Sequence, residues 1–132
     1  MKSRKAFKDD VVAKFNIILN RDLMELGAKS VILINISGDI LTSLNNGEAL
    51  YDVESLATLA AGNIGALKAM ASTINNELPM FIVRGERESI HFSHISKDLL
   101  LVSIFGHEIS VGYIRIKLAS ATKAIREIIK SK

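Results

Sequence analysis

The spacing of the apolar residues changes several times along the chain, and each change predicts a new element of secondary structure. Residues 4–26 place apolar side chains three or four positions apart, which is the spacing of a helix that buries one face. Gly27 follows and predicts the end of this helix, because glycine readily adopts the conformation found at a helix C-terminus. The predicted buried face consists of Val12, Phe15, Ile18, Leu19, Leu23 and Leu26.

Residues 31–44 predict a β-hairpin. The sequence VILINI at residues 31–36 is rich in β-branched side chains, residues 37–39 have the composition of a turn, and residues 40–44 resume a strand pattern. The first of these strands is apolar on both faces. We therefore expect it to lie at the centre of a sheet that has a layer of helices on each side.

A second helix, three more strands and a third helix are predicted for the rest of the chain. Asp52 occupies the N-cap position of a helix that continues to about residue 76, and Pro79 follows its end. Strand patterns at residues 80–84, 89–94 and 99–105 are separated by turn-forming clusters. Helical spacing returns at residues 111–128.

The resulting order, α-β-β-α-β-β-β-α, contains no βαβ alternation and predicts an α+β fold. We expect a three-layer sandwich in which an antiparallel five-stranded sheet carries one helix on one face and two on the other. The chain has 132 residues and no linker-like or low-complexity segment. We therefore expect a single domain over residues 1–132.

The second helix is unusual because it keeps two glycines, Gly62 and Gly65, each of which costs a helix about 1 kcal/mol relative to alanine. At 100° per residue, one largely apolar stripe is expected to lie on the sheet. This stripe consists of Val53, Leu56, Ala60, Asn63, Leu67, Met70 and Ile74, flanked by Ile64 and Ala71. The opposite side carries only small uncharged residues, namely Ser55, Thr58, Ala61, Gly62, Gly65, Ala66, Ala69 and Thr73.

A helix face without large or charged side chains lets another backbone come close, and the contact area gained offsets the cost of the glycines. We therefore predict that the outer side of the second helix is a protein interface. The alternative is that another helix of the same chain covers it, but the first and third helices have apolar faces of their own and are expected on the other side of the sheet.

The composition excludes several classes of protein. The chain has no cysteine, which excludes disulfides, thiol catalysis and cysteine-based metal sites. No apolar run approaches the roughly 18 residues of a membrane span, and the charged N-terminus has no hydrophobic signal region, so we expect a cytoplasmic protein. Basic residues gather at both ends of the chain, but only 5% of the residues are aromatic. We therefore expect no nucleic-acid partner, and membrane contact only indirectly if at all.

No arrangement of reactive side chains predicts an active site, a cofactor site or a metal site. His91 and His94 would point to opposite faces of a strand and would make a poor metal clip. The two glycines near Lys68 lie inside a helix rather than in a phosphate-binding loop. Arg84 and Arg87 flank a hairpin tip that is more simply explained as a solvated turn than as an arginine finger. We therefore do not expect an enzyme.

Three segments resemble the Roadblock family of dynein light-chain and bacterial GTPase-regulator proteins. They are GAKSVILINISGDILTSL at residues 27–44, DVESLATLAAGNIGALKAM at residues 52–70, and FIVRGERESIHFSHISKDLLLVSIF leading to GYIRIKLASATKAIREII at residues 81–129. The resemblance implies a dimer, with itself or a paralogue, and a Ras-like small GTPase as partner. It also implies that the second helix and a sheet edge, formed by Met80, Phe81, Ile82, Val83 and Arg84, meet their counterparts in the dimer.

In this family the small face of the second helix lies at protein interfaces, which carries over here to Ala57, Ala61, Gly65 and Ala69. Together with the pattern of the helix itself, the expected interface is Ala57, Thr58, Ala61, Gly62, Gly65, Ala66 and Ala69.

The first functional interpretation is a dimeric protein that binds a Ras-like small GTPase and modulates its GTP hydrolysis. The second is a non-catalytic scaffold subunit of a motor or of a membrane-associated complex. The third is a small-molecule sensor, for which Asn63 and His91 are the only polar residues that we would nominate.

Overall fold

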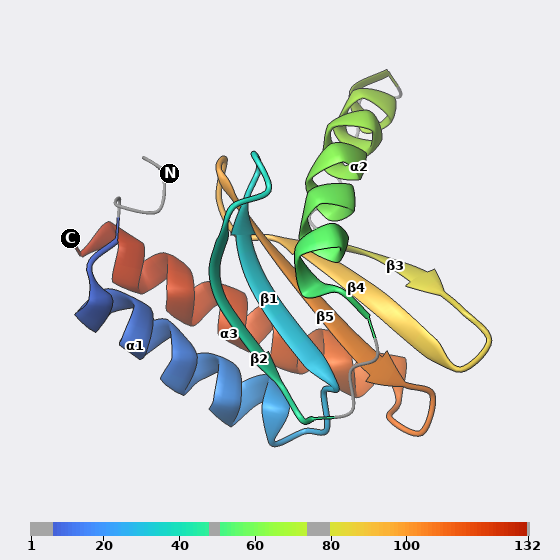
Figure 1. Ribbon diagram of the computed structural model, residues 1–132, viewed down its shortest axis with the longest axis horizontal. Coiled ribbons are helices and arrows are strands. Elements are labelled where there is room, and N and C mark those ends of the chain that lie inside the picture. The colour runs from blue at the N-terminus through green and yellow to red at the C-terminus, as the bar shows by residue number, and fades with distance from the viewer. Residues whose placement is uncertain (1–6, 48–50, 74–79, 132) are drawn as a thin grey trace.

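The computed structural model describes residues 7–47, 51–73 and 80–131, and it has the predicted three layers (Figure 1). Helices α1 (Asp9–Leu19) and α3 (Val111–Lys130) cover one face of a five-stranded antiparallel sheet, and helix α2 (Val53–Thr73) covers the other. The strands are β1 (Ser30–Asn35), β2 (Ile40–Asn45), β3 (Met80–Arg84), β4 (Glu88–His94) and β5 (Leu99–Gly106). The predicted fold class and the predicted order of elements are confirmed.

The strands lie in the order β2-β1-β5-β4-β3, so the two hairpins flank a central pairing of β1 with β5. Every residue of β1 and of β5 is buried. This confirms that the apolar strand at residues 31–36 is internal, because only a strand covered on both faces can bury consecutive side chains. β2 and β3 form the two edges of the sheet.

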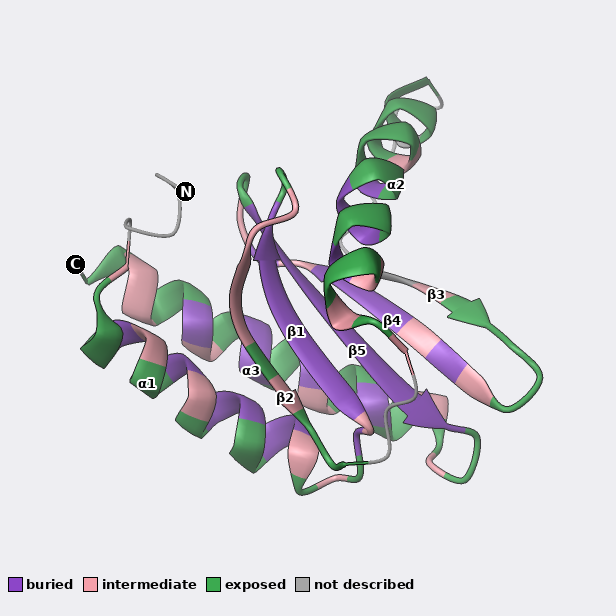
Figure 2. Ribbon diagram, viewed as in Figure 1, coloured by how far each residue is buried: buried purple, intermediate pink, exposed green. Residues whose placement is uncertain are grey.

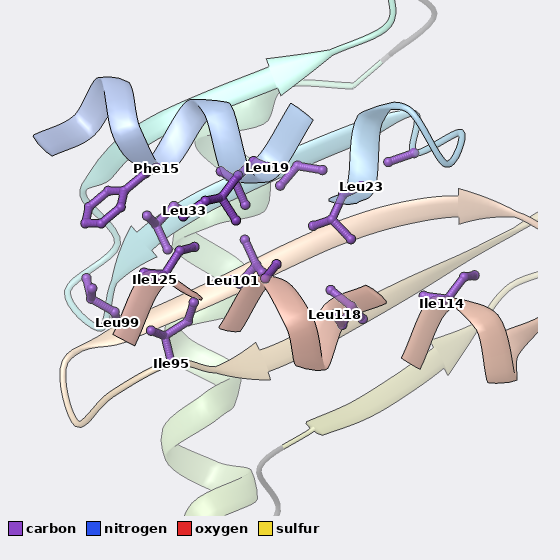
Figure 3. Packing of buried hydrophobic residues seen from close by; sticks show 14 of the residues in the cluster. Phe15, Leu19, Leu23, Leu33, Ile95, Leu99, Leu101, Ile114, Leu118 and Ile125 are labelled. Carbon is purple, nitrogen blue, oxygen red and sulfur yellow. The ribbon is translucent and has the colours of Figure 1, made fainter. Parts of the chain in front are cut away.

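The larger core lies between the sheet and the α1–α3 layer (Figure 3). Phe15 and Leu19 of α1 point toward Leu33 and Leu101 of the two central strands, and Leu118 of α3 closes the same cluster. α1 and α3 therefore share one hydrophobic core with the sheet. No helix of the described residues is long and apolar enough to cross a membrane.

The predicted first helix is present, but it is not α-helical throughout. α1 ends at Leu19 and continues as a single π-helical turn, η2 (Asn20–Met24), in which the N–H of Glu25 donates to the carbonyl of Asn20 (2.9 Å). Asp22 is buried in this turn, on the same helical face as the buried Ile18 and Leu19, which precede it by four and three positions. Residues 4–6 of the predicted helix lie outside the described residues.

The buried Asp22 has hydrogen-bond donors on two elements. Its carboxylate accepts two hydrogen bonds from Arg21 (both 2.9 Å) and one from the hydroxyl of Ser120 on α3 (3.0 Å). Burial acts to raise the pKa of Asp22, but these hydrogen bonds and the nearby Lys117 together hold it below its usual value. The π-helical turn is thus fixed to α3 by a charged hydrogen-bond cluster.

Candidate protein interface on helix α2 and strand β3

Helix α2 begins where the sequence predicts, because Asp52 caps it. The carboxylate of Asp52 accepts hydrogen bonds from the backbone N–H of Glu54 (3.1 Å) and from the hydroxyl of Ser55 (2.9 Å). These bonds satisfy a free N–H of the first turn and, with the Ser55 bond as the largest cause, lower the pKa of Asp52. The N-terminal end of α2 is therefore fixed locally.

The side of α2 that packs on the sheet includes four residues of the predicted stripe and its flank, but it is rotated toward Ala57 and Ala61. The buried positions are Ala57, Ala60, Ala61 and Ile64, with Val53 and Leu56 partly buried beside them. They contact Ile32, Ile34, Phe92, Leu100 and Val102 of the central strands. The alanines bring the helix axis close to the sheet, which larger side chains would prevent.

Two predicted interface residues, Ala57 and Ala61, therefore belong to the core of this chain. Ala57 is fully buried, and Ala61 lies beside the β1–β2 turn, where a Cβ placed on Gly38 would be 3.8 Å from the Ala61 Cβ and 3.6 Å from the Thr58 Cα. Gly38 has a φ of 96°, which suits glycine in this turn. Part of the small face of α2 thus accommodates a turn of the same chain.

The remaining predicted interface residues are exposed. They are Thr58, Gly62, Gly65, Ala66 and Ala69. A Cβ added to Gly62 or to Gly65 would meet nothing within 4 Å outside the helix's own backbone and the neighbouring residues. Packing within the described part of the chain therefore does not explain why these two positions lack a side chain.

Asn63 and Met70 were predicted to face the sheet, and both are exposed, Met70 to 65%. Leu59, which the sequence pattern placed on neither side, is also 65% exposed. Figure 2 shows that the C-terminal half of α2, which extends beyond the sheet, is exposed on nearly all sides. Ala71 and Ile74 of the predicted stripe lie outside the described side chains.

The exposed surface of α2 therefore combines small residues with large apolar ones. Between Glu54 and Lys68 the helix has no charged residue. A solvated surface helix normally carries charged side chains, and exposed large apolar side chains that lie together mark interaction sites. The exposure of Leu59 and Met70 was the signal that sequence reasoning missed.

Strand β3 forms at the predicted residues and lies at the edge of the sheet. It pairs with β4 through Met80↔Ser93 to Arg84↔Ser89, and its other side faces no strand among the described residues. Val83 on this strand is half exposed. Such an edge presents unpaired backbone groups and can pair with another strand.

The nominated polar residues do not converge on a ligand site. His91 is fully buried on the α1–α3 side, with its ring edge-on to Phe105 at 5.5 Å, whereas Asn63 is exposed on α2. Neither ring nitrogen of His91 has a hydrogen-bond partner in the described part of the chain. Burial, followed by the positive charges of Arg84 and Arg115, lowers the pKa of His91 to about 4.

Other candidate chemical groups are dispersed. Arg84 and Arg87 are exposed at the β3–β4 hairpin, and His107 and Glu108 are exposed before α3. Within the described ranges, no group of three or more histidine, aspartate or glutamate side chains is placed to hold a metal ion. What the geometry offers is an exposed, largely uncharged helix face and an open sheet edge.

No family model matches the chain, and no curated protein matches its sequence. Solved structures match it over almost its whole length. MglB of Myxococcus xanthus is 28% identical, with a TM-score of 0.86 over 95% of this chain and 93% of that one. The gliding protein MglB of Thermus thermophilus is 24% identical, with a TM-score of 0.85 over 96% of each chain.

A Roadblock/LC7 domain from Streptomyces avermitilis is 15% identical, with a TM-score of 0.72 over 85% of this chain and 98% of that one. The chain has the Roadblock-family fold. The resemblance inferred from the three sequence segments is thereby confirmed at the level of the fold. Because these matches cover at least 85% of each chain, the Roadblock fold accounts for the three layers and for the positions of α2 and β3.

Proposed function

We propose that this protein, a single Roadblock-type domain over residues 1–132, is a dimeric regulator that binds a Ras-like small GTPase and modulates its GTP hydrolysis. The proposal is supported by the Roadblock fold and by the 28% identity to MglB over nearly the whole chain. The observation that carries it is the exposed face of α2, where Gly62 and Gly65 have no neighbour that would need the absence of a side chain.

The proposed contact on α2 combines small residues with larger apolar side chains. Gly62, Gly65, Ala66 and Ala69 allow a partner backbone to approach, and Leu59 and Met70 supply exposed apolar area on the same helix. Such a contact gains dispersion and removes apolar surface from water without burying an unpaired charge.

Strand β3 is the proposed dimer contact. Two copies of an edge strand can pair antiparallel around a two-fold axis and extend the sheet from one protomer into the next. Val83, which is half exposed, then becomes buried against the partner, and the backbone groups of the free edge become paired.

Regulation in this proposal takes place through binding, and the chain itself supplies no catalytic residue. The GTPase keeps its own nucleotide site, and the contact with α2 stabilises one arrangement of the residues around it. A regulator of this kind must bind two states of the GTPase with different affinities, because a ligand shifts an equilibrium only by its differential affinity.

Single-turnover GTP hydrolysis tests the proposal. A Ras-like small GTPase from the same organism is loaded with GTP, and its turnover is measured against increasing concentrations of the wild-type protein and of Gly65→Arg. The variant adds a large charged side chain where the described chain leaves open space, so the fold is expected to persist while binding and acceleration are lost.

Gly112→Arg is the matched control. Gly112 is also an exposed helical glycine with nothing within 4 Å of its Cβ position, but it lies on α3, on the opposite side of the sheet. This variant should retain the effect on turnover. A complex that forms without any change in turnover would instead favour the scaffold interpretation, and equal loss in both variants would contradict the assignment to α2.

A further inference from the structure

The helical layer opposite α2 also carries exposed apolar side chains. Ile17 on α1 and Ile116 on α3 are each 66% exposed, and Tyr113 on α3 is half exposed. The buried positions of these helices, which face the sheet, are Val11, Phe15, Ile18 and Leu19 on α1 and Ile114, Leu118, Ala121, Thr122 and Ile125 on α3. Ile17 and Ile116 therefore lie on the outward side of the layer.

The same layer is basic, while the rest of the described chain is acidic. Helix α3 carries five basic residues and one acidic residue, Glu127. α1 adds Lys14, whereas the charge of Arg21 is paired with that of the buried Asp22. Asp9 and Asp10 lie in the first turn of α1. Outside this layer, the described residues include eight acidic and six basic ones.

We infer that the outward side of α1, η2 and α3, here called the basic layer, docks on the surface of an anionic lipid bilayer. Basic side chains are attracted to anionic headgroups, and single isoleucines insert between lipids. Tyr113, whose ring lies 5.9 Å from the Lys117 ammonium, has the amphipathic character found at bilayer interfaces. Isolated isoleucines among basic residues suit this contact better than a folded protein partner, which needs a contiguous apolar centre.

The orientation of the dimer strengthens the inference, and this step rests on the proposed pairing of β3. The local two-fold axis of an antiparallel strand pair is perpendicular to the sheet, so the faces of the two sheets match. Both basic layers then lie on one side of the extended sheet, and both α2 helices lie on the other. A dimer can contact the bilayer with two layers at once and still present α2 to a GTPase.

Co-sedimentation of the full chain with extruded vesicles tests the inference. Wild-type protein should bind vesicles containing about 30% phosphatidylglycerol in phosphatidylcholine, and binding should decrease strongly as NaCl is raised. It should not bind pure phosphatidylcholine. Lys14→Gln/Lys123→Gln should weaken binding roughly 30-fold, since each removes one basic contact. Ile17→Ser/Ile116→Ser should weaken it roughly tenfold or more.

Ile36→Ser/Lys97→Gln is the matched control, because both residues are exposed in turns outside the basic layer. It should bind vesicles like the wild type, and circular dichroism should show that all variants are folded. Failure of the wild type to bind anionic vesicles at low salt would overturn the inference. Binding that depends on the isoleucines but not on the lysines would overturn it too, whereas binding that depends on the lysines alone would contradict the insertion of Ile17 and Ile116 between lipids.

The membrane test and the GTPase test are independent. Gly65→Arg should still bind vesicles, and the double isoleucine variant should still act on the GTPase in solution. Loss of both properties in one of these variants would contradict the separation of the two surfaces.

Discussion

Replacing both glycines of α2 with alanine should stabilise the free protein and weaken its complexes. Gly62 and Gly65 are helical, and a Cβ at either position meets nothing within 4 Å. Each substitution then gains the difference in helix propensity, about 1 kcal/mol, and the pair about 2 kcal/mol. For a chain of 132 residues this corresponds to an increase in melting temperature of roughly 7 °C.

The same two methyl groups should hinder close approach by a partner. Overpacking a well-fitted contact costs about 1–3 kcal/mol, so the affinity of the complex should fall about fivefold or more. Thermal unfolding by circular dichroism over a series of protein concentrations separates the stability of the chain from that of the dimer. Titration calorimetry with the GTPase, and sedimentation equilibrium for self-association, then measure the two complexes.

Two other glycines provide controls for Gly62→Ala/Gly65→Ala. Gly112→Ala, on α3, should leave both complexes intact. Gly38→Ala should lower the melting temperature, because its φ of 96° is strained for alanine. Unchanged affinity of the double variant for both partners would refute the close-approach reasoning, and an unchanged melting temperature would refute its structural premise.

The remaining predictions concern pH, the π-helical turn and the sheet edge. His91 has a pKa of about 4 when folded and an ordinary value near 6.5 when unfolded, so the unfolded chain binds the extra proton. The stability that comes from keeping His91 neutral is complete above pH 6.5 and is lost as the pH falls toward 4. In urea unfolding, the free energy of unfolding should therefore fall between pH 7 and pH 4.5 by roughly 2–3 kcal/mol less in His91→Phe than in the wild type. Asp22→Ala should cost roughly 1–3 kcal/mol in the same assay, because it removes charge-assisted hydrogen bonds from Arg21 and Ser120; a loss below a few tenths would contradict the role given to this cluster. Val83→Lys should shift the protein to a monomer in sedimentation velocity without lowering its helix content, whereas a persistent dimer would exclude β3 as the dimer contact.

The hydrophobic pattern predicted the elements and their layers because the strongest signals in this chain are local. The VILINI strand is apolar at nearly every position, and such a strand can bury both of its faces only between two layers. The turn at Gly38 and the cap at Asp52 also act over a few residues. These features could therefore be recognised without any knowledge of long-range contacts.

The π-helical turn could not be predicted in this way. Its residues have ordinary helical spacing, with Leu19 and Leu23 four positions apart. What accompanies the wider turn is a hydrogen bond between Asp22 and Ser120, which are separated by 98 positions in the sequence. A local pattern contains no information about such a partner. Asp22 shares the helical spacing of Ile18 and Leu19, but the hydroxyl that bonds it lies on a distant segment.

The helical phase of α2 was predicted with an error for a related reason. Alanines lie on both sides of this helix, and their size suits either a close contact with the sheet or a close contact with a partner. The choice is made by Gly38, whose turn packs beside Thr58 and Ala61, and by the central strands beneath Ala57. A stripe of small residues thus indicates close approach but does not identify the approaching element.

The two halves of α2 are stabilised by different interactions, and this difference connects the sequence of the helix with the proposed function. The N-terminal half has a capped end and a buried alanine face, so the sheet stabilises it. The C-terminal half extends beyond the sheet, with Met70 exposed and with the two glycines at its start, so it depends on intrinsic helix propensity that those glycines reduce. A partner that packs against Gly62 and Gly65 also supplies the tertiary contacts that this half lacks. Binding would then stabilise a helix that the two glycines weaken in the free chain.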